Sequence, residues 1–185
     1  MSPVQARSAR SIDDILAAAR HRFGENGYHA TSIDDIAADV GRTKGAIYHH
    51  YPDKQALFRR VFQDEQRAIA EAVAGVGDLR GGVAKYLRTI ASSPASARIT
   101  LVDGPGVLGW QAWRTCDDGP FRSMLRAALS AQAGVADRYD VDRLAELLLG
   151  AITEAALHVA TAPAPTSVAR RYGAQLDLMI DAIVG

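Results

Sequence analysis

Two short amphipathic segments with a glycine between them constrain the fold of this chain more than any other feature. Apolar side chains recur at helical spacing over residues 33–40, and a second, very short segment runs from about 43 to 49. Gly41 interrupts the pattern, and Thr43 can cap the second helix by accepting a backbone N–H. Two short helices joined by a tight turn containing glycine are typical of a helix-turn-helix. The apolar residues expected to hold this unit together are Ile33, Ile36, Ala37, Val40, Ile47, Leu57 and Phe58.

Longer helical patterns flank this pair. An amphipathic segment covers residues 11–26 and ends at a glycine, a common helix terminator. Thr31, with Asp34 three residues later, is the expected cap of the first short helix. Pro52 ends the second short helix, because the residue before a proline avoids the helical conformation. Asp53 can then cap a long helix that extends to about residue 74.

The rest of the chain predicts further helices and no convincing strand. Glycines loosen the pattern after residue 74, and breaks are expected at 103–106 and at Gly119-Pro120. The fold class is therefore predicted to be all-α, with a three-helix helix-turn-helix domain at 1–55 and a larger helical domain at 56–185. The expected helices of that larger domain lie at about 83–91, 94–102, 107–113, 121–136, 141–162 and 167–184.

Charge and composition argue against several classes of protein but do not by themselves indicate DNA binding. The net charge is zero, yet residues 1–60 hold nine Lys and Arg against seven Asp and Glu, and four of the five histidines lie in the first fifty residues. Cys116 is the only cysteine, so neither an intrachain disulfide nor a cysteine-based zinc site is expected. No signal peptide or apolar run of membrane-spanning length is evident, so we expect a cytoplasmic protein that needs no membrane, metal or cofactor.

The short second helix carries the residues that suit contact with duplex DNA. A helix that enters the major groove needs small residues where its backbone approaches the bases, and Gly45 provides that room. It also needs donors that reach phosphates. For Lys44 and Lys54 the alternative is a solvated charge, for Tyr48 it is helix packing, and Arg42 could reach a phosphate or base edge or remain solvated. The candidate DNA contacts are Thr31, Arg42, Thr43, Lys44, Gly45, Tyr48, His49, His50 and Lys54.

A set of residue types at fixed spacing covers this part of the chain: Gly27, Tyr28, Thr31, Ile36, Ala37, Gly41, Lys44, Gly45, Tyr48, His50, Tyr51, Lys54, Leu57 and Phe58. This pattern resembles the N-terminal pattern of the TetR family of bacterial transcriptional regulators over about residues 10–62. The resemblance implies a recognition helix at about 43–49 and a homodimer that binds a palindromic DNA operator, usually as a repressor released by a small molecule. Arg42 departs from the family, which commonly has a small apolar residue there, and Tyr51 replaces a more usual phenylalanine.

For the larger domain, the resemblance implies an effector site and a dimer interface. The last two helices correspond to the pair that forms the four-helix dimer interface in the family, and their leucines and alanines suit close packing. No effector can be inferred from the resemblance, because family members diverge in this half. For the two tryptophans the alternative is ordinary core packing, and for His158 it is a satisfied interface or core histidine. The candidate effector-site residues are Phe62, Trp110, Trp113, Met124 and His158.

Two other classes of function remain as alternatives. A small-molecule enzyme or sequestering protein is disfavoured, because no nucleophile–base pair, paired carboxylates or phosphate-binding loop has usable spacing. Asp103, before Gly104-Pro105-Gly106, is a lone carboxylate of the kind found in turns. A constitutive nucleoid or activator-type DNA binder without an effector is the third hypothesis, and a larger domain without a cavity would favour it. We expect a DNA-binding regulator that is not an enzyme.

Overall fold

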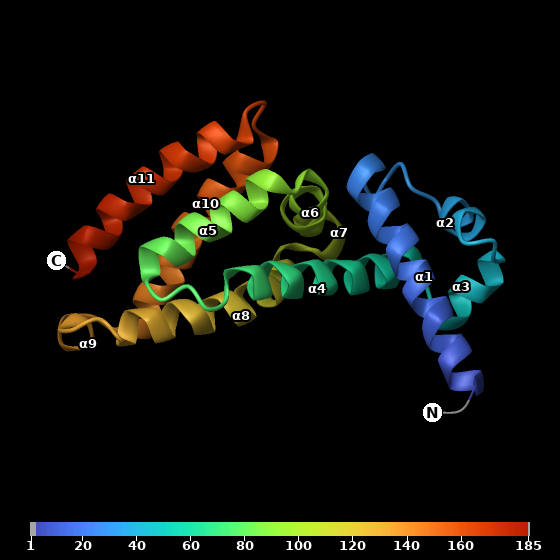
Figure 1. Cartoon of the computed structure of the whole chain (residues 1–185), viewed down its shortest axis with the longest axis horizontal. Helices are drawn as coiled ribbons and strands as arrows, with labels where there is room; N and C mark the ends of the chain where they lie inside the picture. Colours follow the sequence, from blue (N-terminus) through green and yellow to red (C-terminus); the bar gives the residue numbers. More distant parts are fainter. Residues whose placement is uncertain (1–2, 185) are drawn as a thin grey trace.

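The computed structural model describes residues 3–184, with side chains for residues 11–115 and 120–184, and its described part contains helices and no strand. Figure 1 shows α1 (Pro3–Asn26), α2 (Ile33–Asp39) and α3 (Lys44–His50) at one end of an elongated molecule. The predicted all-α fold class is therefore confirmed. The remaining helices are α4 (Lys54–Val73), α5 (Leu79–Ser92), α6 (Pro94–Ala97), the π-helix η1 (Arg98–Asp103), α7 (Gly104–Leu108), α8 (Trp110–Ser130), α9 (Val135–Arg138), α10 (Val141–Thr161) and α11 (Pro165–Val184).

A small aromatic and aliphatic core holds α1, α2 and α3 against the start of α4. Ile36 on α2 and Ile47 on α3 are fully buried between the helices. The Phe23 ring of α1 meets the Phe58 ring of α4 edge to face, with 5.2 Å between centroids. We call α1, α2 and α3 the helix-turn-helix unit and, from the role that the family resemblance implies, the helices from α5 to α11 the regulatory unit.

The helix caps predicted at Thr43 and Asp53 are correct, whereas Ser11, also expected as a cap, lies inside α1. Thr43 accepts the Ala46 N–H at the start of α3, and Asp53 caps α4. The cap of α2 is Ser32 rather than Thr31, and its capping box is completed by Asp35 rather than Asp34. The prediction was wrong by one residue because the Thr31 side chain turns inward, which leaves the exposed Ser32 hydroxyl to accept the α2 amide.

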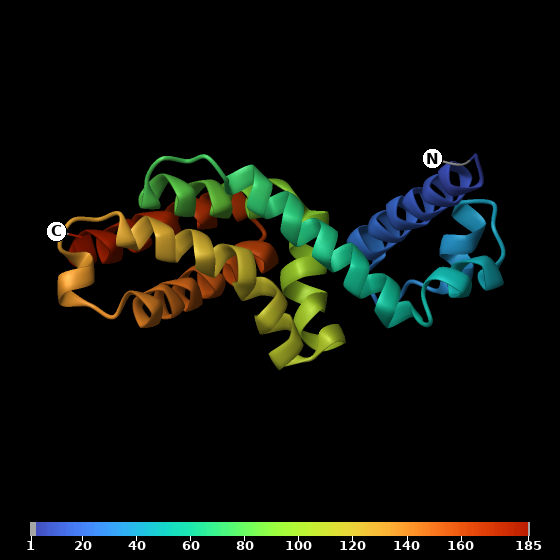
Figure 2. The ribbon, with the colours of Figure 1, turned by 90° about the horizontal axis from the view of Figure 1, so that it is seen from below.

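α4 runs between the two units and packs against α1 at one end and α5 and α8 at the other (Figure 2). Its buried face runs from Leu57 near the helix-turn-helix to Val73 at its far end, and Glu65 and Gln66 interrupt the apolar residues near its middle. The proposed domain boundary at residue 55 therefore falls within a helix that belongs to both units. That boundary remains a prediction.

Two expected breaks in the regulatory unit are helical instead. The turn expected at 103–106 is helical instead: α7 begins at Gly104, and Pro105 fits the first turn of a helix. The chain breaks at Gly109, where φ is +82°. α8 continues through Pro120, with Trp113 buried before it and Leu129 buried after it. Packing on both sides overrides the local preference of the proline. The expected loosening at residues 81–82 is also wrong, because Asp78 caps α5 through the Gly81 N–H.

α10 is the central helix of the regulatory unit. Among the described helices it alone has the length and apolar composition of a membrane-spanning segment, although its sequence holds no uninterrupted apolar run of that length. Its Leu148, Ile152 and Ala156 side chains are buried against neighbouring helices, and α10 packs on α8, α11 and α5. Burial within the protein explains its apolar composition.

Candidate nucleic-acid interface

A glycine turn sets α3 across α2. Gly41 has a φ of +61°, a conformation that side chains rarely adopt. The Gly41 N–H donates to the Ala38 carbonyl at 3.2 Å, and the Arg42 N–H donates to the Ala37 carbonyl at 2.9 Å. These bonds satisfy carbonyls at the end of α2 and reverse the chain. Ile47 then anchors α3 on the core and leaves the opposite face of α3 in solvent.

The exposed face of α3 contains most of the predicted contact residues. Tyr48 is 42% exposed, a high value for a large ring. A Cβ added to Gly45 would meet only the Thr43 Oγ1 atom, at 3.9 Å, so packing within the protein does not require a glycine there. Without a side chain at this position, the backbone of α3 is open to close approach by a partner. The predicted contacts on this face are Arg42, Thr43, Lys44, Gly45, Tyr48 and His49, all exposed, and His50, which is half-buried.

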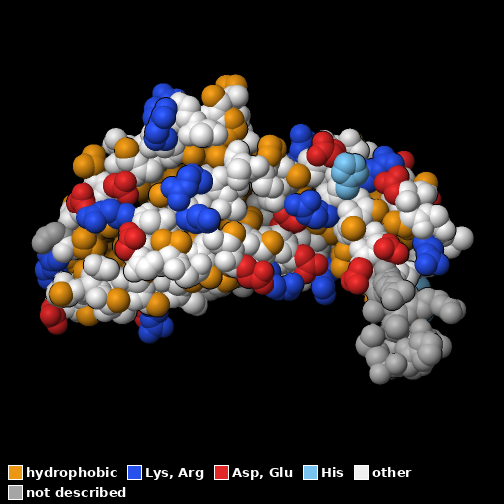
Figure 3. All heavy atoms as spheres, in the orientation of Figure 1, with side chains coloured by type: hydrophobic (Ala, Val, Ile, Leu, Met, Phe, Trp, Pro, Cys, Tyr) orange, Lys and Arg blue, Asp and Glu red, His pale blue; other side chains and the backbone are white. Residues whose placement is uncertain are grey.

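An acidic side chain of α2 pairs with the lysine of this exposed face and reduces the net positive charge of the face. Lys44 Nζ donates to Asp34 Oδ2 at 2.8 Å, and this contact raises the pKa of Lys44 above its ordinary value. Both side chains are exposed, so the pair is worth little in the free protein. Lys44 is therefore charged and can exchange Asp34 for a phosphate. Figure 3 shows basic and acidic side chains interspersed over the visible surface, with no large region of one sign.

Two of the predicted contacts instead support the turn between α1 and α2. The Thr31 side chain is buried, and its hydroxyl lies 2.9 Å from the Gly27 carbonyl, to which it donates. Lys54 is half-buried, and its Nζ donates to the Tyr28 and Thr31 carbonyls, both at 2.9 Å, while lying 4.1 Å from the centroid of the Tyr28 ring. Thr31 has no exposed hydroxyl to offer a phosphate, whereas the Lys54 ammonium keeps a third proton.

The five candidate effector residues do not form one site. Phe62 and Trp113 are fully buried, and the Trp113 indole N–H donates to the Thr100 carbonyl at 2.8 Å. Trp110 is 60% exposed. His158 is also exposed, lies 3.2 Å from Glu154 and stacks on the Tyr172 ring. Met124 borders a cavity, and with Phe62 it also lines an open groove between α4 and α8 of about 540 Å³.

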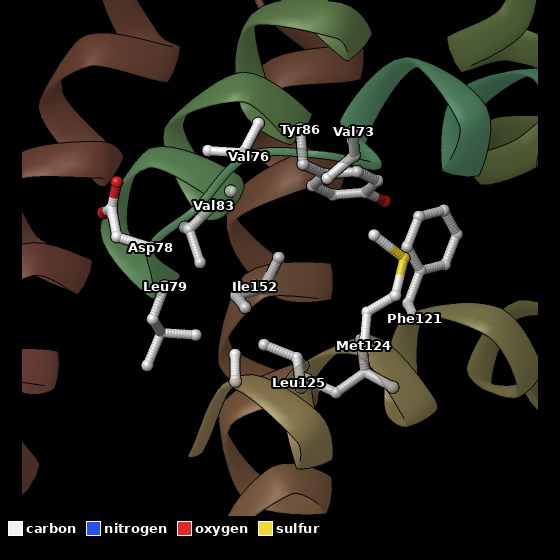
Figure 4. Close-up of a pocket in the computed structure, with 13 residues that line it drawn as sticks. Val73, Val76, Asp78, Leu79, Val83, Tyr86, Phe121, Met124, Leu125 and Ile152 are labelled. Carbon is white, nitrogen blue, oxygen red and sulfur yellow. The ribbon is translucent and has the colours of Figure 1, made fainter. Parts of the chain in front are cut away.

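The cavity beside Met124 is small and apolar. Figure 4 shows it between α5, α8 and α10, with Val83, Ile152 and Leu125 pointing into it. Its volume is about 90 Å³. Sequence reasoning missed most of its walls, because helical periodicity marks a face as buried but not which buried face borders a void. The lining residues are Val73, Val76, Asp78, Leu79, Gly82, Val83, Tyr86, Phe121, Met124, Leu125, Ala128, Leu149 and Ile152.

The last two helices expose large apolar side chains. Leu147 on α10 is 72% exposed, and Leu178 and Met179 on α11 are 62% and 47% exposed. Large apolar residues exposed on neighbouring helices are typical of a surface that another protein covers. The side chain of Cys116, the single cysteine of the sequence, lies outside the described side chains.

The geometry of α2, the glycine turn and α3 defines a helix-turn-helix DNA-binding protein with a helical second unit. The chain belongs to the TetR family. The family model described as bacterial regulatory proteins, tetR family, matches residues 15–61. The model described as tetracyclin repressor-like, C-terminal domain, matches residues 76–183. The resemblance predicted from residues 10–62 is confirmed, and the second model extends it over the regulatory unit.

Named relatives point the same way. The HTH-type transcriptional repressor AcnR of Corynebacterium jeikeium is 38% identical over 64 residues, which are 35% of this chain and 34% of that protein. The HTH-type transcriptional regulator UidR of Escherichia coli is 35% identical over 80 residues, 41% of each chain. The matches thus span less than half the length of these curated relatives. A TetR-family regulator from Pectobacterium atrosepticum aligns over 100% of this chain and 98% of that one, with a TM-score of 0.73 and 24% identity, which shows the shared fold.

Proposed function

We propose that this chain is a transcriptional repressor that binds a palindromic DNA operator as a homodimer, with α3 as the recognition helix in the major groove. The observation that carries the proposal is the solvent-facing side of α3, where Gly45 opens the backbone to a partner and Lys44 stands ready to exchange Asp34 for a phosphate. The regulators named among the relatives support the same class of activity. Operator DNA in a bacterium lies in the cytoplasm, which is where we place the protein.

The DNA contacts divide by chemistry. Lys44 and Lys54 supply charge for phosphates, and Tyr48 can donate its hydroxyl to a phosphate. Arg42 and His49 carry ring or guanidinium N–H groups that suit either a phosphate or a base edge. Thr43 and His50 complete the set at the two ends of α3. Thr31 is left out of the interface because its hydroxyl is bonded inside the protein.

Dimerisation is proposed through α10 and α11. Leu147 and Leu178 are exposed in the single chain, and a second copy that covers them would remove their apolar surface from water. Two recognition helices related by a twofold axis read two half-sites one turn of DNA or more apart, which explains why the operator should be palindromic.

The effector is proposed to be a small uncharged apolar molecule that enters the cavity between α5, α8 and α10. Small-molecule sites usually have about 300–1,000 Å³, so a cavity of about 90 Å³ must widen when a larger ligand binds. Widening would move α8 and α10 apart, and a ligand that favours this state would shift the dimer away from its operator-bound geometry. The presence of a cavity favours this hypothesis over a constitutive DNA binder, and the named relatives lend no support to an enzyme.

Selection of random duplex DNA on the purified protein tests the proposal. We expect a palindromic consensus whose affinity falls steeply with salt, since phosphate contacts release counterions. A folded dimer that enriches no sequence at low salt, with or without apolar candidate effectors, would contradict DNA recognition by α3.

A further inference from the structure

The end of α1 meets α6 and η1 at a joint between the two units. A Cβ on Gly24 would lie 2.7 Å from the Ala95 Cβ, closer than real Cβ contacts. A Cβ on Gly27 would lie 3.3 Å from Arg98 Nη1 and 3.4 Å from Asp103 Oδ2, and its φ of +83° also favours glycine. The two glycines lie three residues apart, so the last turn of α1 rests on the regulatory unit with almost no space between them.

A hydrogen bond from the regulatory unit holds the turn that leads into α2. Asp103 Oδ2 accepts the Tyr28 N–H at 2.9 Å. On the other side of the turn, Lys54 donates to the Tyr28 and Thr31 carbonyls. The next residue, Ser32, caps α2. The turn is therefore fixed from both sides immediately before the helix-turn-helix begins.

A second contact ties the same elements together in the interior. Glu65 on α4 is 5% exposed. Arg20 on α1 and Ser96 on α6 both donate to its carboxylate, and Ser93 and Ser96 share a further hydrogen bond of 2.8 Å. Removal of these partners would leave a buried carboxylate without hydrogen bonds, which is costly, so Glu65 resists separation of α1 from α6.

The backbone around Asp103 is tightly packed against side chains of α4 and α8. The Trp113 indole N–H donates to the Thr100 carbonyl of η1. A Cβ on Gly104, next to Asp103, would lie 2.9 Å from Phe62 Cε2 and 3.0 Å from Trp113 Cδ1. This segment has no free space in which to shift, so the position of Asp103 follows that of α4 and α8.

We propose that Asp103 is a positioning residue, which fixes the orientation of α2 and α3 relative to the regulatory unit through its hydrogen bond to the Tyr28 N–H. In a dimer this bond sets where the two recognition helices lie relative to one another. The inference rests on the proposed function for its effect on DNA binding, but the contact itself is independent of DNA.

Three variants of the full chain separate this role from a general loss of stability. Asp103→Ala removes the acceptor, and Asp103→Asn keeps an acceptor oxygen while removing the charge. Asp140→Ala is the matched control, because Asp140 also accepts a backbone N–H, that of Arg143 at 3.2 Å, but at the start of α10. Hydrogen exchange of the Tyr28 amide and of the amides of α2 is measured without DNA, and affinity for the selected operator is measured at several salt concentrations.

We expect Asp103→Ala to speed exchange at Tyr28 and in α2 while exchange in α10 stays unchanged. Operator affinity should fall by about fivefold or more, the usual scale of coupling between distant sites, with an unchanged salt slope because no phosphate contact is lost. Asp103→Asn and Asp140→Ala should bind within about twofold of the unsubstituted protein, well below the tenfold that corresponds to about 1.4 kcal/mol.

Several results would overturn the inference. The inference is wrong if hydrogen exchange of the Tyr28 amide is unchanged in Asp103→Ala. It is also wrong if Asp140→Ala loses as much operator affinity as Asp103→Ala. Asp103→Asn as weak as Asp103→Ala would show that charge rather than the hydrogen bond is responsible. If the unsubstituted protein binds no duplex DNA, the proposed function fails, and the exchange measurements still decide whether Asp103 holds the turn.

Discussion

Substitution of Gly45 by alanine should change stability and DNA affinity in opposite directions. Gly45 lies within α3, where glycine costs about 0.5–1 kcal/mol relative to alanine. The added Cβ would meet only Thr43 Oγ1, at 3.9 Å, so the full gain should be realised. For a chain of this size a gain of that order raises Tm by roughly 1–4 °C. Thermal unfolding by circular dichroism measures this effect.

The same methyl group would stand where the backbone of α3 is proposed to approach the DNA. A displacement that lengthens even one good base contact removes on the order of 1–3 kcal/mol, which is roughly a 5- to 150-fold loss of operator affinity. Gly106→Ala is the control, since a Cβ on this helical glycine of α7 meets nothing within 4 Å and α7 lies outside the proposed interface. If Gly45→Ala is more stable and still binds the operator with full affinity, the explanation of Gly45 by close approach to DNA is wrong. If Gly45→Ala is less stable, the conclusion that a Cβ has room at this position is wrong.

Three further predictions concern charge, assembly and pH. Lys44→Ala should lower the salt slope of operator binding by about one unit, and an unchanged slope would remove Lys44 from the phosphate contacts. Leu147→Glu should convert the dimer to monomer in sedimentation velocity without unfolding it, because Leu147 is exposed in the single chain. Bonds from Ser32 hold the pKa of Asp35 below its ordinary value. The stability that Asp35 adds is therefore complete above the ordinary carboxyl pKa and is lost as the pH falls through the lowered one, so urea unfolding of Asp35→Asn should show a weaker loss of stability in acid than the unsubstituted protein.

The helix-turn-helix was predictable because its determinants are local. The spacing of Ile33 and Ile36, the turn at Gly41 and the cap at Thr43 all act within a few residues, and each is in the structure as expected. The α2 cap was misplaced because two adjacent hydroxyl residues could both serve. The choice of Ser32 depends on where the preceding turn packs, which residues 31–34 alone do not specify.

Most of the effector candidates do not line the cavity, for a different physical reason. Trp113 and Phe62 pack around Gly104, a contact that brings α4 against α7 and α8 much later in the sequence. Large aromatic residues at helical spacing look alike whether they border a void or fill one. Tyr86 and Phe121 stand at the cavity only because α5 and α8 cross there. A void forms where several helices meet, so the sequence of a single helix does not predict it.

The interspersed charges of the surface affect how such a protein would search a genome. A strongly basic regulator is held on arbitrary DNA by its own field and spends much of its search sliding along the duplex. This chain has a net charge of zero and no extended basic region on the face seen in Figure 3. If it binds an operator as proposed, the surface on this face would add little to its retention on unrelated DNA, and it would reach the operator largely from free solution. Release from the operator would then clear the promoter promptly, because little nearby duplex would recapture the protein.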